Sequence, residues 1–294
     1  MELKIYEEKK GIIVSGLNDF EPRHIFECGQ CFRWDREEDG SYTGVAHSRV
    51  LNVKKEGDIV IFNNTSRSDF EGIWMDYFDI GRDYSAIKEK LRKLDEHLER
   101  SVEFGYGIRL LKQDVWETTV SFIISANNAI PKIKKTIDTL SYLANEEIIE
   151  YGGRKFYAFP SPETIHMFHE KCVDNCKAGY RAQYIKDSCS MIINRDVDLE
   201  RLAEFGSHEC RKELMRLPGV GPKVADCIML FALQKFDAFP VDVWVKRVIS
   251  SLYNQEDMSL NKMREFALGR FGDLAGFAQQ YLFYYARENG VGRK

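Results

Sequence analysis

The first third of the chain alternates short apolar runs with turn-forming residues. The runs are rich in β-branched and aromatic side chains, and pairs such as Asp39-Gly40 separate them. This pattern is typical of strands joined by tight turns. Because no helical segments alternate with the runs, a parallel doubly wound sheet is disfavoured. We predict an antiparallel sheet whose strands span residues 4–6, 11–15, 31–35, 42–46, 51–54 and 58–63.

From about Tyr84 the spacing of the apolar residues changes to that of helices. Ile87, Leu91, Leu94 and Leu98 recur every three or four positions, as in an amphipathic helix. The remainder of the chain carries further helix signals and little strand pattern. We therefore expect helices to dominate after the sheet.

Capping residues and prolines mark the later helices. Asp114 and Glu117 have the three-residue spacing of a capping box. Proline is favoured in the first turn of a helix, and glycine just after the last. The other predicted helices run from Pro131 over 132–144, from Ser161-Pro162-Glu163 onward, over 209–217, 222–233 and 243–252, and over 274–288 with a stop at Gly290.

These patterns predict an α+β fold with two parts. An N-terminal antiparallel sheet domain covers residues 1–105, and a mostly helical region covers 106–294. No internal repeat and no low-complexity linker marks the boundary between them.

Composition and charge narrow the function classes. With 294 residues, 44% hydrophobic and 30% charged, the chain has ordinary globular usage, which disfavours a disordered or fibrous protein. The formal net charge of −4 disfavours a nucleic-acid binder whose whole surface is basic. Any DNA-binding function must therefore come from a local face.

The cysteines and the apolar segments indicate a cellular compartment. Seven cysteines form no evident disulfide framework in a chain of this size, which indicates a reducing environment. The first ten residues are charged, and no run reaches 18 apolar residues. We expect a soluble cytoplasmic protein without a membrane segment.

The most informative stretch is the predicted helical hairpin at about 209–233. Its two helices are joined by Pro218-Gly219-Val220-Gly221. Glycines there leave backbone N–H groups uncovered at the start of the second helix, where the helix dipole also favours an anion. This arrangement suits a phosphate. The alternative is a hairpin whose glycines only make the turn.

Lys223 and Asp242 add candidate chemistry to this hairpin. Lys223 lies in the first turn of the second helix, where the dipole disfavours a cation and, with burial, would lower the lysine pKa and make the amine nucleophilic. Asp242 follows an apolar Pro240-Val241 pair, and a buried carboxylate there needs a partner. Together they suit attack on an electron-poor, acetal-like carbon. The alternative is a surface lysine and a carboxylate that only caps the helix 243–252.

The sequence 217–227 (LPGVGPKVADC), followed by Val241-Asp242-Val243, resembles the helix-hairpin-helix plus Gly/Pro-Asp signature of DNA glycosylases. Within that superfamily it is most similar to the 8-oxoguanine DNA glycosylase/AP lyase family. Four more segments match in the family's order, so the resemblance covers nearly the whole chain. They are 29–34 (GQCFRW), 125–130 (SANNAI), 179–184 (GYRAQY) and 278–283 (AQQYLF).

The resemblance implies a fold, an activity and a catalytic pair. The N-terminal sheet would resemble the TATA-binding-protein fold. The enzyme would act on double-stranded DNA containing 8-oxoguanine, without a metal or other cofactor. Because one chain carries a complete pocket, we expect a monomer. Lys223 would attack C1′ of the flipped nucleotide, expel the base and cut the strand by β-elimination through a Schiff base. Asp242 would stabilise the oxocarbenium-like transition state.

The resemblance also assigns a base pocket. Gly29 would accept the N7–H of 8-oxoguanine with its backbone carbonyl. Ordinary guanine has an acceptor at N7, which that carbonyl would repel. Gln279 would read the Watson–Crick edge, and Phe283 and Cys227 would sandwich the base. Core packing is the alternative role for Phe283 and Cys227.

Further matched residues imply contacts to the DNA. Asn127 would fill the gap left by the flipped base, Arg181 would donate to the estranged cytosine, and Tyr180 would wedge beside it. Gly219 and Gly221 would bind phosphate. The alternatives are a helix end capped by Asn127, a solvated charge at Arg181 and packing at Tyr180.

Two positions depart from the family pattern. Lys132 stands where better-known members have an arginine that contacts the opposite cytosine, and lysine lacks the planar fork. We therefore predict weaker discrimination among opposite bases. Trp244 stands where those members have a histidine, which puts that backbone contact in doubt. Lys246 and Arg247 are nearby substitutes, or a solvated face.

Three other functions stay open at this point. A glycosylase for another lesion is one, although no cysteine follows Cys227 to build the iron–sulfur cluster common in the pyrimidine and adenine branches, and the alkyl-base branch lacks the hairpin lysine. A non-catalytic helix-hairpin-helix module is the second. A metal protein is the third, from the ligand-like spacings Cys28/Cys31 and His166/His169/Cys172/Cys176.

Overall fold

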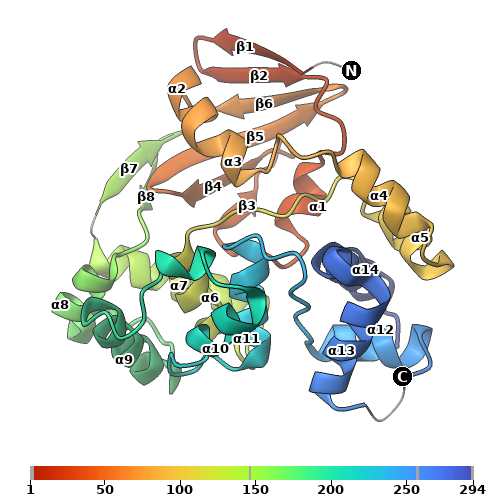
Figure 1. Cartoon of the computed structure of the whole chain (residues 1–294). Coiled ribbons are helices and arrows are strands. Elements are labelled where there is room, and N and C mark those ends of the chain that lie inside the picture. Colours follow the sequence, from red (N-terminus) through yellow and green to blue (C-terminus); the bar gives the residue numbers. More distant parts are fainter. Residues whose placement is uncertain (1–2, 146, 256–257, 293–294) are drawn as a thin grey trace.

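The computed structural model describes residues 3–145, 147–255 and 258–292. The first third of the chain forms a six-stranded antiparallel sheet in the order β1-β2-β6-β5-β4-β3 (Figure 1). The predicted α+β class and the antiparallel sheet are confirmed. The strands are β1 (Lys4–Glu8), β2 (Gly11–Ser15), β3 (Trp34–Arg36), β4 (Tyr42–Ala46), β5 (Arg49–Glu56) and β6 (Ile59–Asn63). The third strand begins at Trp34 rather than at residue 31.

An aromatic cluster forms the core of the sheet. Ile12 of β2 pairs with Phe62 of β6, and both side chains are fully buried. The Phe62 ring lies 5.8 Å from that of Phe20, 5.0 Å from that of Phe70 and 5.5 Å from that of Phe78, between centroids. Such aromatic pairs contribute ~0.5–1.5 kcal/mol beyond area burial. They attach the turns after β6 to the sheet. These turns are α2 (Arg67–Asp69), η1 (Phe70–Trp74) and α3 (Met75–Tyr77).

The expected amphipathic helix after Tyr84 is two helices. They are α4 (Tyr84–Arg92) and α5 (Glu96–Phe104). Asp95 caps α5, because its carboxylate accepts from the Leu98 amide at 2.9 Å. This cap starts a new helix at a point where the apolar spacing continues without interruption. Leu94, which the pattern placed on the apolar face, is 41% exposed. The prediction was wrong because a local cap outcompeted the periodicity.

The capping signals at the later helices are confirmed. Asp114 accepts from the Glu117 amide at 2.7 Å and begins α6 (Val115–Ser125). The Glu117 carboxylate lies 3.7 Å from the Arg33 guanidinium. Ser161 caps α8 (Pro162–Cys172) in the same way. Side-chain acceptors thus fix where these helices start.

The helical region contains the predicted helices and several that the pattern missed. Confirmed are α7 (Ile130–Ala144), the hairpin pair α10 (Ser207–Leu214) and α11 (Pro222–Phe231), α12 (Val243–Leu252) and α14 (Ala275–Asn289). Missed were α1 (Pro22–Phe26), the hairpin β7 (Ile148–Tyr151) and β8 (Arg154–Tyr157), α9 (Arg181–Ile193), η2 (Arg201–Ala203), α13 (Leu260–Phe271) and η3 (Gly272–Leu274).

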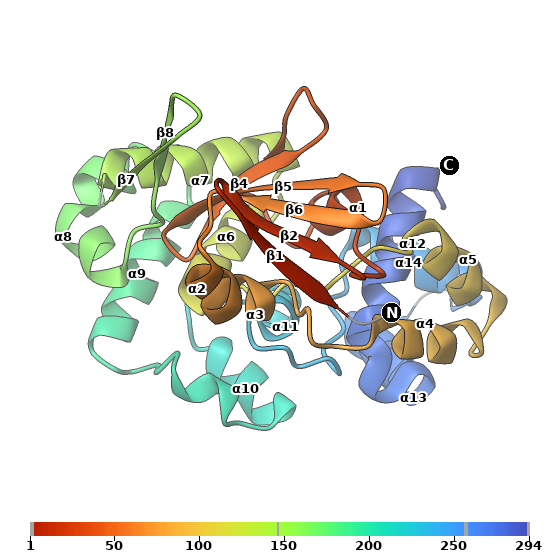
Figure 2. The same cartoon turned by 90° about the horizontal axis from the view of Figure 1, so that it is seen from above.

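The helices form two groups beneath the sheet. Helices α6 to α11 make one group, and α4, α5 and α12 to α14 make the other (Figures 1 and 2). One apolar core runs through both groups. Helices α11 and α14, from different groups, face the small cavity that carries the candidate site. The domain boundary at residue 105 stays a prediction. Within the described residues, no helix has the length and apolarity to cross a membrane.

Candidate active site

The loop 215–221 connects α10 and α11 through a backbone that needs glycine. Gly219 has φ +81°, and a Cβ at that position would come within 2.6 Å of the Tyr184 ring. Gly221 is the N-cap of α11 and supplies no side chain, so no side-chain cap bond closes this helix end. The positive end of the α11 dipole therefore faces outward at Gly221.

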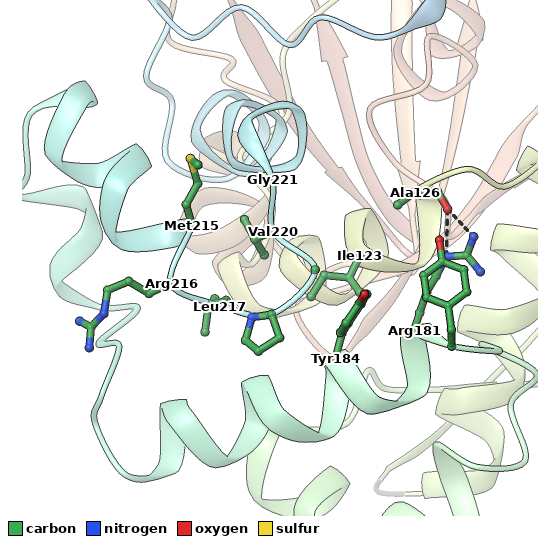
Figure 3. A pocket seen from close by; sticks show the side chains of 12 residues that line it. Ile123, Ala126, Arg181, Tyr184, Met215, Arg216, Leu217, Val220 and Gly221 are labelled. Atoms are coloured by element: carbon green, nitrogen blue, oxygen red, sulfur yellow. Dashed lines mark hydrogen bonds between the residues drawn. The ribbon is translucent and has the colours of Figure 1, made fainter.

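A groove of about 470 Å³ follows this loop. Figure 3 shows the loop residues from Met215 to Gly221 on one side of it, with Tyr184 and Arg181 of α9 on the other. Tyr180, at the start of α9, is 59% exposed. The groove combines open backbone N–H groups with an exposed aromatic ring, which suits a nucleic-acid backbone and an adjacent base.

Lys223 is the second residue of α11 and lies in its first turn, with its side chain half-buried. Its ammonium is 4.9 Å from the centroid of the Phe122 ring. Cys227 follows one turn later on the same face and is buried. Burial raises the pKa of the Cys227 thiol to about 12, against the opposing charge and hydrogen bond of Lys223. The thiol is therefore neutral and packs beside the lysine.

Asp242 is both a helix cap and an electrostatic partner of Lys223. Its carboxylate accepts from the Val245 amide at 2.8 Å and begins α12. Burial raises the pKa of Asp242, and the Val245 amide and the Lys223 charge oppose that shift. The capping role weighed from the sequence is therefore real, and it holds the carboxylate in the field of the lysine.

Six of the residues predicted for catalysis and base binding line one cavity. The cavity measures about 40 Å³, close to the ~30 Å³ share of one water molecule in the liquid. It is therefore far too small for a purine while Phe283 lies in this position. The predicted residues are Gly29, Lys223, Cys227, Asp242, Gln279 and Phe283; Cys28, Phe122, Phe231, Pro240 and Gln280 complete the lining.

Phe283 closes the cavity over Gly29. Gly29 has φ +82°, and a Cβ built on it would lie 3.0 Å from the Phe283 ring. Gln279 is 4% exposed, and its amide oxygen has no hydrogen-bond partner among the described residues. A buried acceptor without a donor costs free energy, and a ligand in this cavity could supply the donor.

Arg181 is buried rather than a solvated charge. It is 6% exposed, and its guanidinium donates to the Ala126 carbonyl (Figure 3). It also donates to the Asn127 carbonyl and lies 4.4 Å from the centroid of the Tyr180 ring. Asn127 is exposed with φ +50°. Arg181 therefore supports the Asn127 loop in this form, and its N–H groups do not point freely toward solvent.

The lysines of α7 differ in whether their ammonium groups are exposed or bonded to the sheet. Lys132 is exposed. Lys134 donates to the Trp34 carbonyl at 2.6 Å and to Asp35 at 2.5 Å, so it joins α7 to the sheet. Trp244, on α12, lies beneath the Arg247 guanidinium at 4.8 Å. This contact places a cation at the helix end where the family pattern has histidine.

The sequence did not single out three residues of this region. Phe122 lies under the Lys223 ammonium, Gln280 lines the cavity and Arg287 lies against Gly29. Gln280 neighbours the matched Gln279, which was the available signal. Phe122 and Arg287 carried none, because an apolar helix residue and a charge near the chain end are ordinary features.

The ligand-like spacings do not assemble a metal site. Cys28, Cys31, Cys172 and Cys176 are free and buried. His169 instead has its Nδ1 4.0 Å from Asp174. Among the described residues, no group of three or more His, Cys, Asp or Glu side chains is arranged to hold a metal ion.

Comparison with known families decides the classification. Residues 12–119 match the 8-oxoguanine DNA glycosylase N-terminal domain, and residues 120–272 match the HhH-GPD superfamily base excision DNA repair protein. The chain belongs to the 8-oxoguanine DNA glycosylase/AP lyase family. The predicted resemblance is thereby confirmed at the level of the family.

Relatives of this family member cover most of its length. It is 32% identical to a probable N-glycosylase/DNA lyase of Methanothermobacter thermautotrophicus, over 82% of this chain and 81% of the relative. It is 28% identical to the N-glycosylase/DNA lyase OGG1 of Arabidopsis thaliana, over 88% and 75%. It is also similar to the Clostridium acetobutylicum 8-oxoguanine glycosylase/lyase in complex with double-stranded DNA containing cytosine opposite 8-oxoguanine. That structure is 49% identical, with a TM-score of 0.96 and coverage of 99% and 100%.

Proposed function

We propose that this protein removes 8-oxoguanine from double-stranded DNA and then cuts the strand, as a bifunctional glycosylase and AP lyase of base-excision repair. The observation that carries the proposal is the convergence on one cavity of Lys223, Asp242 and the Gly29 backbone with the unpartnered Gln279 amide. Family membership and the similarity to the Clostridium enzyme support the same lesion.

The chemistry follows from the Lys223–Asp242 arrangement. The target nucleotide must first leave the helix, because its C1′ is otherwise shielded by the stack. The Lys223 amine attacks C1′, the C1′–N9 bond breaks, and its electron pair leaves with the base, which takes up the proton that the attacking amine loses. The ionised Asp242 carboxylate stabilises the positive charge that develops on the sugar.

Strand cleavage uses the covalent bond that Lys223 has formed. The sugar ring opens to a Schiff base between Lys223 and C1′. Loss of a C2′ proton then expels the 3′ phosphate by β-elimination. The cut therefore lies 3′ to the lesion, and hydrolysis of the imine releases the lysine.

Lesion recognition rests on hydrogen-bond polarity. 8-Oxoguanine carries N7–H, whereas guanine carries an acceptor at N7. The Gly29 carbonyl attracts the first and repels the second. The Gln279 amide oxygen, unpartnered before DNA binds, accepts from the N–H groups of the Watson–Crick edge. Phe283 and Cys227 enclose the two faces of the base once Phe283 has moved.

The duplex is held along the groove beside α11. Backbone N–H groups at Gly219 and Gly221 bind a phosphate, and the exposed Tyr180 wedges at the gap. Asn127 occupies the space of the flipped base, on a loop that Arg181 supports. Four of the five N–H groups of the Arg181 guanidinium go to the Ala126, Asn127 and Ala178 carbonyls, so the remaining Nη1–H is the one that would donate to the estranged cytosine.

The cysteines and the cavity bear on the cellular compartment and the oligomeric state of the enzyme. We place it in the cytoplasm, because its seven cysteines are free thiols. It works as a monomer, because one chain supplies both the nucleophile and the base pocket.

Borohydride trapping tests the proposal. Wild-type protein, mixed with a duplex carrying 8-oxoguanine opposite cytosine, should form a covalent adduct on reduction of the Schiff base. Lys223→Gln should lose the adduct and the strand cut while retaining duplex binding. Lys262→Gln, an exposed lysine on α13, is the matched control and should trap like wild type. Wild type that binds the duplex without forming an adduct would overturn the lyase activity. Release of the free base would then distinguish a glycosylase without lyase activity from a non-catalytic DNA-binding module.

A further inference from the structure

The backbone around Gly29 shows a regular pattern of occupied carbonyls. The Glu27 carbonyl accepts from the Arg287 guanidinium, and the Cys28 carbonyl accepts from the Gln280 amide at 2.6 Å. The Gln30 carbonyl accepts from the Gln113 amide at 2.7 Å. Among the described residues, no group donates to the Gly29 carbonyl.

The three donor side chains come from parts of the chain far from Gly29 in the sequence. Gln280 and Arg287 lie two turns apart on α14, and Gln113 lies just before α6. The side chain of Gln280 is 1% exposed, so water cannot take the place of the Cys28 carbonyl as the acceptor of its amide N–H. The bonds to the Cys28 and Gln30 carbonyls fix the peptide planes on either side of the Gly29–Gln30 peptide, and the bond to the Glu27 carbonyl fixes the preceding one. Gly29 has no Cβ and adopts φ +82°, so without these bonds its carbonyl direction is poorly restrained.

Arg287 also acts on the ring that covers Gly29. Its guanidinium lies 5.4 Å from the centroid of the Phe283 ring and 5.7 Å from that of Tyr284. Glu288 accepts from it at 2.9 Å, which holds the guanidinium in place. One side chain thus connects the recognition peptide to the ring that encloses the base.

We propose that Gln113, Gln280 and Arg287 are positioning residues for lesion recognition: they occupy the neighbouring carbonyls and hold the Gly29 carbonyl as the free acceptor for N7–H. This inference rests on the proposed function and deepens it. The carbonyl distinguishes 8-oxoguanine from guanine only while its direction is fixed. A displacement of about 1 Å in a site of this kind costs up to about a hundredfold in rate.

The test separates base recognition from the chemistry at C1′. A duplex with 8-oxoguanine opposite cytosine needs the Gly29 carbonyl, whereas a duplex with a preformed abasic site needs only Lys223 and Asp242. Single-turnover rates on both substrates give a ratio for each variant. Gln280→Met and Arg287→Met remove the donors while retaining the length of the side chains.

We expect the ratio to fall about tenfold in each single variant and about a hundredfold in the double variant, with abasic-site cleavage within about twofold of wild type. Arg287→Lys retains a donor for Glu27 and should recover most of the ratio. The matched controls are Gln255→Met, whose amide donates to the Tyr253 carbonyl, and Arg49→Met, whose guanidinium donates to the Ser48 carbonyl. Both should keep the wild-type ratio.

Different outcomes of this experiment overturn different parts of the argument. An unchanged ratio, or a parallel loss of both rates in Gln280→Met and Arg287→Met, overturns the inference, because the bonds would then be irrelevant or merely structural. An Arg287→Lys variant as impaired as Arg287→Met overturns the donor role of that residue. Wild type that cleaves abasic sites but not 8-oxoguanine would overturn the proposed function itself.

Discussion

A buried carboxylate on the helix that carries Lys223 gives a direct test of what stabilises the site. Asp226 of α11 is fully buried and accepts from two arginines. Arg211 of α10 donates at 2.7 Å, and Arg264 of α13 donates at 2.7 Å and 2.6 Å. Asp226 lies three residues after Lys223, so these bonds anchor the helix that carries the nucleophile to α10 and α13.

Replacing Asp226 by Asn removes the negative charge and leaves both cations. Arg264 has a side chain only 9% exposed, so it cannot recover its hydration. Removing one partner of such a buried network costs about 3–5 kcal/mol. For a chain of this size that corresponds to a melting temperature lower by about 10 °C. Arg211 is 19% exposed, so Arg211→Met should cost less than Asp226→Asn.

Thermal unfolding of the single variants and of the combined Asp226→Leu, Arg211→Met, Arg264→Met protein checks this reasoning. The combined variant leaves no uncompensated charge, and we expect it to recover most of the lost stability, since hydrophobic replacement of a buried ion network is often neutral. An Asp226→Asn protein that melts within about 2 °C of wild type would refute the argument. A combined variant as unstable as Asp226→Asn would show that packing, and not charge, is responsible.

Three further outcomes are expected. Gly219→Ala should destabilise the fold by about 1–3 kcal/mol and weaken duplex binding in a mobility shift, because the added methyl group would clash with the Tyr184 ring and the backbone has a positive φ. Gly221→Ala is the control: its φ is −86° and the space around it is open, so it should melt like wild type. Lys132 is a point donor, so excision of 8-oxoguanine opposite C, A, G and T should differ by less than about tenfold; a strict requirement for C would contradict this. Burial raises the pKa of Asp242, so on acidification the single-turnover activity should begin to fall at a pH above the ordinary aspartate range. Asp242→Asn should abolish activity at every pH but melt near wild type, because an asparagine oxygen can also cap the helix.

The fold could be predicted from the sequence where local signals and tertiary packing agree. Strands such as Gly11–Ser15 combine β-branched residues with turns on both sides, and Asp114 and Ser161 mark their helices by a side-chain acceptor. Helices α9 and α13 were missed because their apolar residues do not gather on one face. The break before α5 was missed because the apolar spacing continues across it.

The candidate site divides in a similar way. Lys223 and Asp242 could be found because a short motif places each at a helix start with a chemical reason for its type. The burial of Arg181 could not, since its partners are backbone carbonyls of Ala126 and Asn127, more than 50 positions away and invisible in a residue pattern. The donors to the carbonyls around Gly29 were hidden for the same reason, as Gln280 and Arg287 approach from some 250 residues along the chain.

The closed ring over Gly29 also determines which molecules the enzyme ignores. Oxidised nucleotides and free 8-oxoguanine circulate in a cell alongside damaged DNA, and they carry the same N7–H. A cavity of about 40 Å³ admits none of them until the Phe283 ring moves. We expect contacts along the neighbouring groove to supply the free energy for that movement, and only a duplex can make those contacts. Free 8-oxoguanine and its nucleotides should therefore inhibit the enzyme weakly compared with a lesion-bearing duplex.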